Sequence, residues 1–356
     1  MKILVLPEPS PWLQRAAFLS AAGEELIVLA PWAVSERLLR RLPARLRARF
    51  GHRALDGARS VPGWTGVDAA LRAWAGSAAH RLIQARLARR RLVDHLAARM
   101  IRQLGSAVDA VIAPTLGSHR AFAAAPIAAR RILVEDLPLL RELHRDLDRA
   151  LAVHPSCAFL RRFRAPDSAI VRQETELALA DELYTRSRYG AELHHARGRE
   201  RSTVHPLRVP AVAASSAARA DGPVLRPVIQ LAGLAAARTG AVEALALLEH
   251  LPEVWLMARM GDGTEPTALL RHPRVIAPGS ARADVVIAPA WCESVAPELE
   301  RAVAAGVPVI ATGAGAGWLE PHELAARLDR PSAPALIAAV TAALSPGAPG
   351  VPGAPR

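Results

Sequence analysis

Residues 283–312, with the sequence ADVVIAPAWCESVAPELERAVAAGVPVIAT, constrain the fold of this chain more than any other stretch. The apolar run Val285-Val286-Ile287 is typical of a strand that is buried on both faces. Pro297 suits the first turn of a helix, and Gly306 suits its end. A second apolar run, 309–311, follows. This order of strand, loop, helix, turn and strand predicts one unit of an open parallel sheet flanked by helices.

The loop between this strand and this helix is the first candidate site. In an open α/β sheet, ligands bind where strands end and helices begin, and a helix start attracts anions such as phosphate. The loop offers the Cys292 and Glu293 side chains there. It also offers Ser294 and the backbone amides of Val295 and Ala296 to a phosphate.

The same stretch resembles the C-terminal signature of retaining glycosyltransferases of the GT-B fold, the large family 4 group (glycosyl transferases group 1). That signature has an acidic residue in the loop, a Glu eight residues on, and the tail A-x-A-x-G-x-P-V-I-A-T. Glu293 takes the first acidic position, and the tail matches from Ala302 to Thr312. The second Glu, which holds the nucleotide ribose in the family, is replaced by Arg301. Glu300 lies one residue earlier, about 100° around the helix; both residues are donor-side candidates.

Glycines at two further places agree with this resemblance. After a predicted strand at 227–232, the family has one Gly at the strand end and one at the next helix start, and a G-x-G loop follows its next strand. The resemblance also places the nucleotide base near residues 275–278. The matching positions, which are donor-binding candidates, are Gly233, Gly240, Gly261 and Gly263.

The cations that hold the donor diphosphate in the family are replaced in this chain. Leu234 stands where the family has Arg, and Thr239 stands where it has Lys. Arg238 is adjacent and is the candidate for the phosphate contact, because a guanidinium binds phosphate oxygens bidentately. The alternative for Arg238 is a solvated side chain at a helix start.

The length of 356 residues allows two α/β domains. We predict a Rossmann-like acceptor domain at 1–205, a linker at 206–225, a Rossmann-like nucleotide-sugar domain at 226–344 and a disordered tail at 345–356. Residues 320–328 and 334–344 are predicted helices. The resemblance implies the GT-B arrangement, in which two doubly wound domains face a cleft.

The N-terminal half contributes candidates for the acceptor side. Predicted strands at 108–113 and 132–134 end in polar loops, where the family places acceptor-side groups, often His or Asp. His119 and Asp136 are therefore catalytic candidates, although a single His at a helix start is more often a cap. Asp181 and Ser187 match a family element in which a strand ends in Ser and a short helix follows.

The formal net charge is +12, and Lys2 is the only lysine, so arginine supplies nearly all the positive charge. Abundant Ala, Pro and Gly suggest a GC-rich codon bias behind this composition. Arg-rich helices are predicted at 35–50 and 80–103. They suit either an anionic membrane surface or a solvated basic face. Nucleic acid is a poor partner, because the chain has two Tyr, five Phe and no recognised binding motif.

The remaining composition predicts a cytoplasmic protein, in contact with the inner face of the membrane if the basic helices bind there. Cys157 and Cys292 fall in different predicted domains, which argues against a disulfide framework. There is no CxxC or HExxH motif for a metal site. The N-terminus reads as a strand rather than a signal peptide, and no apolar run is long enough to span a bilayer.

The resemblance implies transfer of a sugar from a nucleotide-diphosphate-sugar to an acceptor, with retention at the anomeric carbon and without a metal. The nucleotide-sugar is a co-substrate, and no other cofactor is implied. Acceptors in the family are often lipid-linked or cell-envelope glycans. The alternative is a GT-B-like binding or scaffold protein without turnover, which the replacements at Leu234, Thr239 and Arg301 favour.

Overall fold

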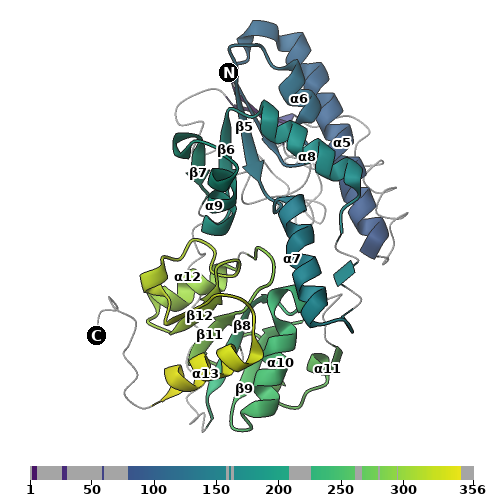
Figure 1. Ribbon diagram of the computed structural model, residues 1–356. Helices are drawn as coiled ribbons and strands as arrows, with labels where there is room; N and C mark the ends of the chain where they lie inside the picture. Colours follow the sequence, from purple (N-terminus) through teal and green to yellow (C-terminus); the bar gives the residue numbers. More distant parts are fainter. Residues whose placement is uncertain are drawn as a thin grey trace, which may run out of the picture. The chain divides into compact units, whose positions relative to one another are not determined.

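The computed structural model describes residues 2–5, 26–29, 58–59, 79–157, 160–161, 164–207, 226–260, 267–279, 281–294 and 296–345. Two parallel sheets with flanking helices make up these residues (Figure 1). The chain divides into two compact units. The first unit consists of Met1–Leu140, Ala165–Thr185 and His194–Leu207, and the second of Arg141–Arg164, Arg186–Leu193 and Arg208–Arg356.

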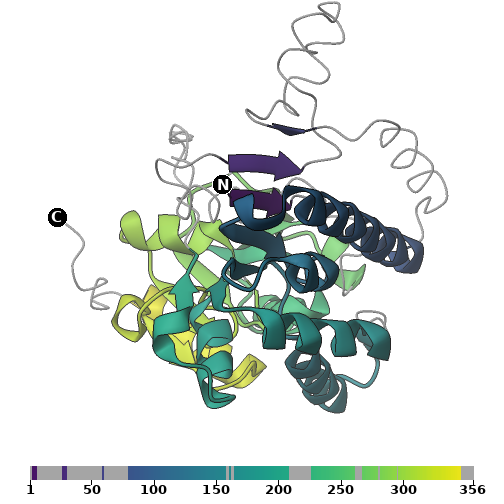
Figure 2. The same ribbon diagram turned by 90° about the horizontal axis from the view of Figure 1, so that it is seen from above.

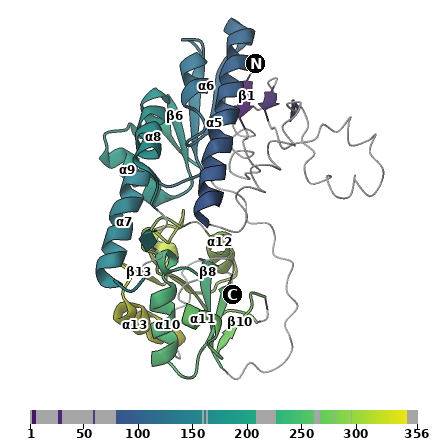
Figure 3. The same cartoon turned by 90° about the vertical axis from the view of Figure 1, so that its right-hand side faces the viewer.

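The first unit contains a parallel sheet with the strand order β3-β2-β1-β4-β5-β6-β7. Helices α5 (Ala79–Leu104), α6 (His119–Ala124) and α8 (Asp167–Leu179) belong to it. Figures 2 and 3 show α5 alongside α6. The strands are β1 (Lys2–Val5), β2 (Leu26–Leu29), β3 (Ala58–Arg59), β4 (Ala110–Pro114), β5 (Arg130–Glu135), β6 (Glu182–Thr185) and β7 (Val204–Pro206).

The second unit contains a parallel sheet with the strand order β10-β9-β8-β11-β12-β13. The order reverses between β8 and β11, so the loops after these two strands are neighbours at the carboxyl edge. The strands are β8 (Val228–Leu234), β9 (Trp255–Arg259), β10 (Val275–Ile276), β11 (Val285–Ala288), β12 (Val309–Thr312) and β13 (Ala326–Leu328). The helices are α7 (Leu140–Val153), α10 (Ala241–His250), α11 (Thr267–Leu270), α12 (Pro297–Ala304) and α13 (Ala333–Leu344), while α9 (Arg188–Ala196) crosses the boundary between the units.

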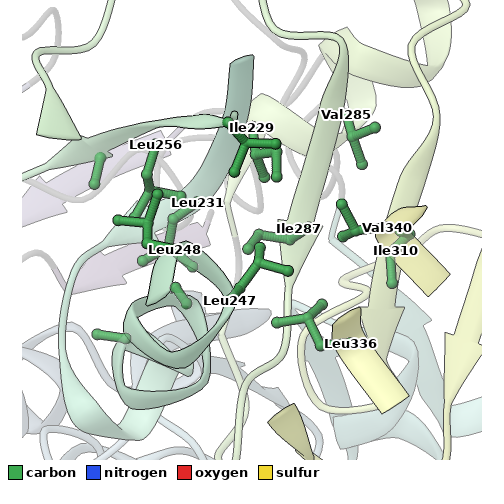
Figure 4. Packing of buried hydrophobic residues seen from close by; sticks show 14 of the residues in the cluster. Ile229, Leu231, Leu247, Leu248, Leu256, Val285, Ile287, Ile310, Leu336 and Val340 are labelled. Carbon is green, nitrogen blue, oxygen red and sulfur yellow. The ribbon is translucent and has the colours of Figure 1, made fainter. Parts of the chain in front are cut away.

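Alternation along β11 explains why its run is apolar throughout. Val285 and Ile287 face a core formed with α10 and α13, which Figure 4 shows from close by. Val286 and Ala288 face the opposite core, formed with α12. Successive side chains of a strand point to opposite faces, so a strand covered by helices on both sides needs apolar residues at every position. The expected buried strand and its amphipathic helix are confirmed.

Two other sequence predictions need correction. Residues 320–328 do not form a helix: a short 3-10 turn, Pro321–Glu323, leads into β13, which pairs in parallel with β12 through Ile310 and Ala326. Pairing with the free edge of β12 outweighs the local helical preference. The sequence also predicts a helix that Gly117 and Ser118 open and that runs through Ala129. It ends at Ala124, because Ala125 precedes Pro126 and takes an extended conformation.

Several expectations fall outside the described residues. These are the Arg-rich stretch 35–50, most of the linker and tail, and the candidates Gly261, Gly263 and Val295. The second Arg-rich stretch is helix α5, whose apolar residues Val93 and Ile101 are buried in the first unit. Within the ranges given above, we find no helix with the length and apolar character to cross a membrane.

A buried carboxylate, Glu176, holds the loop after β4 in place. Glu176 of α8 accepts hydrogen bonds from the backbone amides of Leu116, Ser118 (3.0 Å) and His119 (3.1 Å). Leu116 has a φ of +61°, a conformation that a non-glycine residue adopts at a cost. These amide hydrogen bonds therefore stabilise a strained loop. Burial is the main cause that raises the pKa of Glu176 to about 7.

This pKa predicts how the stability of the first unit depends on pH. The folded state binds the Glu176 proton more tightly than the unfolded state, whose pKa is near 4.5. The resulting stabilisation is present below pH 4.5 and is lost as the pH rises to about 7, a change on the order of 3 kcal/mol. Urea unfolding at pH 5, 6 and 7 should show this decline in wild type and a flatter profile in Glu176→Gln. Glu174→Gln on the same helix is the control, and parallel profiles for wild type and Glu176→Gln would contradict the prediction.

Candidate functional site

The loop between β11 and α12 lies at the reversal point of the second sheet, where its backbone is tied to two neighbouring loops. The amides of Trp291 and Cys292 donate to the carbonyl of Arg238, at 3.0 and 3.4 Å. The amide of Ser294 donates to the carbonyl of Ala314 at 2.9 Å. Three segments that are far apart in the sequence are therefore joined at one edge of the sheet.

Two glycines make this close approach possible. Gly240, which is the predicted glycine at the start of α10, has a φ of +89°, and a Cβ there would lie 2.3 Å from the carbonyl oxygen of Pro289. A Cβ on Gly315 would lie 2.1 Å from the carbonyl oxygen of Ala288. Both distances are too short for any side chain. Gly240 thus has a steric role beside the loop, in addition to the donor-side role that the family pattern suggests.

Glu293 is buried at the end of the loop, with 6% of its surface exposed. Its Oε1 accepts a hydrogen bond from the Ser187 hydroxyl at 2.8 Å, and Arg186 Nη2 lies 3.6 Å from the same oxygen. Ser187 in turn accepts the amide of Gly190 at the start of α9. The carboxylate therefore has a fixed orientation in the second unit. The sequence pattern identified Ser187 as part of a fold element but missed Arg186, the residue before it.

Arg238 is mostly buried beside this loop. Burial lowers the pKa of Arg238, and repulsion from Arg186 adds to the shift, although attraction to Cys292 opposes it. A guanidinium that has lost much of its hydration gains from a nearby anion. Burial also raises the pKa of the Cys292 thiol to about 12, so this thiol is neutral near pH 7 and is a poor nucleophile.

The start of α12 follows directly on this loop. Ala296 is extended, and Pro297, which has no amide hydrogen, occupies the first turn. Gly233 lies close by: a Cβ there would be 3.8 Å from the Ser294 hydroxyl and from the Ala296 side chain. Because Gly233 has no side chain, a ligand can approach this helix start from the β8 side.

A cavity of about 500 Å³ lies beside α12, lined by residues of β8, β9 and α12 and by the segment between β10 and β11. Gly233, Pro278 and Arg301, all expected on the donor side, line it, and Glu300 is not among the residues that line it. The sequence analysis missed Arg259 and Glu298. Glu298 precedes Arg301 by three residues, so the two side chains share one face of α12. The other lining residues are Gln230, Leu231, Met257, Gly279, Ala281, Arg282, Ala283, Val286, Ala302, Ala305 and Val307.

A second cavity, of about 340 Å³, lies on the side of the loop away from α12. Trp291 and Gly313 line it, together with Asp146 and Arg149 of α7 and Tyr189 of α9. Asp146 is buried, accepts a hydrogen bond from the Tyr189 hydroxyl at 3.1 Å and pairs with Arg149. Burial, as the largest cause, raises the pKa of Asp146 to about 6. Helix α7, which the sequence analysis did not predict, therefore carries polar groups of the second unit.

The two acceptor-side candidates lie in the first unit. Asp136 follows β5 and is bound by the fully buried Arg90, with Nη1 3.0 Å from Oδ1 and a second, shorter contact between Nη2 and Oδ2. His119 is half-buried at the first position of α6, and its amide donates to Glu176. The ion pair with Arg90 therefore accounts for the burial of the Asp136 carboxylate without any ligand. The catalytic assignments of both residues stay predictions.

The contact between Gly240 and Pro289 gives a testable prediction. Gly240→Ala should destabilise the protein by roughly 2–4 kcal/mol, because the new methyl group meets the Pro289 backbone and the φ is unfavourable. Gly279→Ala is the matched control. Its φ of +81° is similar, but no heavy atom lies within 4 Å of the added Cβ, so only about 1 kcal/mol should be lost. Thermal unfolding of both variants measures the difference, and equal effects would show that the loop does not depend on this contact.

Comparison with known proteins finds similarity in structure but not in sequence: no protein family and no curated protein matches the sequence. The lipopolysaccharide outer core galactosyltransferase WaaB in its apo form has a TM-score of 0.55 at 11% identity, over 98% of this chain and 92% of that chain. Sucrose-phosphate synthase from Thermosynechococcus elongatus has a TM-score of 0.51 at 14% sequence identity, over 92% of this chain and 82% of that chain. UDP-GlcNAc 2-epimerase from Neisseria meningitidis bound to UDP-GlcNAc has a TM-score of 0.50 at 11% sequence identity, over 96% of this chain and 91% of that chain.

At such low sequence identities, the structural similarity establishes the fold alone. A galactosyltransferase, a synthase and an epimerase share that fold. The predicted resemblance to GT-B glycosyltransferases is confirmed at the level of the fold. The chain has the GT-B fold, an α/β architecture with two Rossmann-like doubly wound sheets.

Proposed function

We propose that this chain is a glycosyltransferase, which moves a sugar from a nucleotide-diphosphate-sugar to an acceptor hydroxyl with retention at the anomeric carbon. The observation that carries the proposal is a fixed carboxylate, Glu293, in a loop whose backbone is hydrogen-bonded to Arg238, with a helix start and a cavity at the same reversal point of the second sheet. The fold places ligands at such a point. One structural neighbour, the UDP-GlcNAc 2-epimerase bound to UDP-GlcNAc, adds that an enzyme with this fold binds a nucleotide-sugar.

Each part of the donor has a matching part of the site. Arg238 and the amides at the start of α12 bind the diphosphate, because a guanidinium and a helix N-terminus both attract negative charge. The nucleoside suits the cavity beside α12, which starts at Gly233 and reaches Pro278 after β10. Glu293 then accepts hydrogen bonds from hydroxyls of the donor sugar, on the far side of the diphosphate.

The reaction needs positioned charge rather than a protein nucleophile. The acceptor oxygen forms a bond to the anomeric carbon while the bond from that carbon to the diphosphate oxygen breaks. The departing diphosphate takes the proton of the acceptor hydroxyl on the same face. Arg238 and the helix start stabilise the negative charge that grows on the diphosphate. We propose that no metal takes part, since these groups supply that stabilisation.

On the acceptor side we propose His119 as the first polar contact, with Asp136 as the second candidate. The acceptor class that fits best is a lipid-linked or cell-envelope glycan, and WaaB, a lipopolysaccharide outer core galactosyltransferase, shows that the fold serves such acceptors. The exposed arginines of α5, among them Arg91 and Arg99, favour a position at the inner, anionic face of a membrane. The buried apolar side of α5 limits that contact to electrostatic attraction.

A binding or scaffold role without turnover is the second candidate. Specific observations favour it: Leu234 and Thr239 replace two family cations, and Leu234 is partly exposed at the end of β8. The Thr239 hydroxyl donates to the carbonyls of Leu234 and Ala236, so it stabilises the turn before α10. In this role the protein would bind nucleotide-sugars and release them unchanged, which product analysis distinguishes from transfer or hydrolysis.

Arg238 is the cation to test first. Arg238→Ala should weaken the binding of UDP, GDP or ADP, whichever the wild type prefers, by about tenfold or more, since one charge-assisted hydrogen bond is lost. Isothermal titration calorimetry measures the change. The exposed Arg271 of the same unit, replaced by Ala, controls for lost net charge. Equal affinities for wild type and Arg238→Ala would remove Arg238 from the phosphate site.

Glu293 tests the sugar contact. Glu293→Gln should lower the transfer rate by about a hundredfold or more, because a charged acceptor is removed from the reacting end of the donor. The amide oxygen can still accept the Ser187 hydroxyl, so the melting temperature should stay within a few degrees. Transfer is followed by mass spectrometry of acceptor extracts with a panel of nucleotide-sugars. Wild-type rates in Glu293→Gln would contradict the assignment.

A further inference from the structure

The cavity of about 340 Å³ beside the β11–α12 loop is lined by fixed polar groups that the proposed reaction does not use. Asp146 of α7 is the buried member of this group, with 6% of its side chain exposed. Its Oδ2 accepts the Tyr189 hydroxyl at 3.1 Å, and its Oδ1 accepts Arg149 Nη1 at 3.1 Å. A buried carboxylate that accepts a donor at each oxygen holds both donors in place. Tyr189 and Arg149 therefore line the cavity in defined orientations.

Both of these side chains keep hydrogen-bonding capacity that a ligand can reach. The Tyr189 hydroxyl uses its proton on Asp146, so its oxygen is left to accept a hydrogen bond. Arg149 uses Nη1 on Asp146 and keeps its other N–H groups, and its side chain is 69% exposed. A ligand in the cavity thus meets one acceptor and several donors, none of which lies beneath the surface.

Trp291 adds an aromatic side chain to the same cavity. Its indole N–H donates to Glu243 Oε1 at 2.8 Å, and that oxygen also pairs with His154 Nε2 at 2.8 Å. The rings of His154 and Trp291 meet edge to face, with their centroids 5.8 Å apart. Neither Glu243 nor His154 is among the residues that line the cavity. The polar end of the indole is therefore used elsewhere, and its apolar part is left for the cavity.

The charges around the cavity indicate an uncharged ligand. Among the described residues that line it, three guanidinium groups are matched by three carboxyl groups. An ion of either sign meets repulsion as well as attraction in such a lining. A neutral molecule avoids this cost, and hydroxyl groups can bond to guanidinium, carboxylate and phenol alike. The charged residues are Arg149, Arg327 and Arg330, and Asp146, Glu192 and Asp329.

A saccharide combines these properties, since it has many hydroxyl groups, no charge and an apolar face formed by its C–H groups. The volume of the cavity agrees with a small ligand, because ligand pockets measure about 300–1,000 Å³.

We propose that this cavity binds a small saccharide, with Tyr189 and Arg149 bonded to its hydroxyl groups and Trp291 against its apolar face. Asp146 is a positioning residue, which orients the first two. The cavity shares no lining residue with the one beside α12, so this is a site separate from that of the nucleotide-sugar. Binding here requires neither a nucleotide nor turnover, and the inference therefore goes beyond the proposed function.

Saturation-transfer difference NMR on the full-length protein without nucleotide tests this site. The probes are glucose, galactose, mannose, N-acetylglucosamine, lactose and maltose, and wild type should bind at least one of them saturably. Tyr189→Phe should weaken that binding by about threefold to tenfold, because the acceptor oxygen is lost. Arg149→Ala should weaken it by about tenfold, because donors to the hydroxyl groups are lost.

Matched controls separate this effect from general damage. Tyr184→Phe removes a hydroxyl from β6, and Arg145→Ala removes an exposed arginine from α7, one turn before Arg149. Neither residue is among those that line the cavity, so both variants should bind the saccharide as wild type does. Thermal unfolding checks that each variant is folded, and either Tyr189→Phe or Arg149→Ala decides alone if the other does not fold.

The possible results keep the inference apart from the proposed function. If Tyr189→Phe and Arg149→Ala bind the saccharide as tightly as wild type, it binds elsewhere and the inference is wrong. If no saccharide of the panel binds, the inference is wrong even if nucleoside diphosphates bind. If inorganic phosphate binds instead and Arg149→Ala weakens it, the cavity is an anion site and the inference is again wrong. Saccharide binding that both variants weaken, in a protein that binds no nucleoside diphosphate, supports the inference and overturns the proposed function.

Discussion

The close backbone contact between the β11–α12 loop and its two neighbouring loops is the constraint on which the site depends. The carbonyl of Arg238 accepts two amides of this loop, and the carbonyl of Ala314 accepts a third. Glycines at 240 and 315 permit the approach, because any side chain there would overlap the backbone of β11 or of the residue after it. The strand order then brings the ends of β8 and β11 together. As a result, Arg238, Glu293 and the start of α12 occupy fixed places at one edge of a rigid sheet.

The charges of the second unit are arranged around this junction. Glu293 accepts a hydrogen bond from the Ser187 hydroxyl and lies near Arg186. The Arg238 guanidinium is mostly buried and has lost much of its hydration. Glu298, in the first turn of α12, is paired with Arg259 at the end of β9. Both signs of charge are therefore present beside the loop and in the wall of the cavity. This mixture suits the donor proposed above, since a nucleotide-sugar has hydroxyls at both ends and a diphosphate between them.

The sequence predicted those features whose cause is local. The apolar runs of β8, β11 and β12 and the prolines and glycines that bound α12 are local signals, and they led to the correct sheet and helix. Strand β13 was missed because its partner, the edge of β12, is not visible in the run 320–328 itself. Arg186 was missed because its contact with Glu293 spans 107 positions. Glu298 was overlooked because the family spacing directed attention to position 301, although both share one helix face.

The most direct test of the central claim is hydrogen exchange of the amides, measured with and without a nucleotide-sugar that binds. If the donor occupies the reversal point of the second sheet, protection should increase in peptides that cover residues 233–240 and 291–301, where the ligand meets backbone amides. Protection confined to the first unit, or no change at saturating ligand, would contradict the placement of the donor. In that case the GT-B fold would remain, but the site described above would not be its donor site.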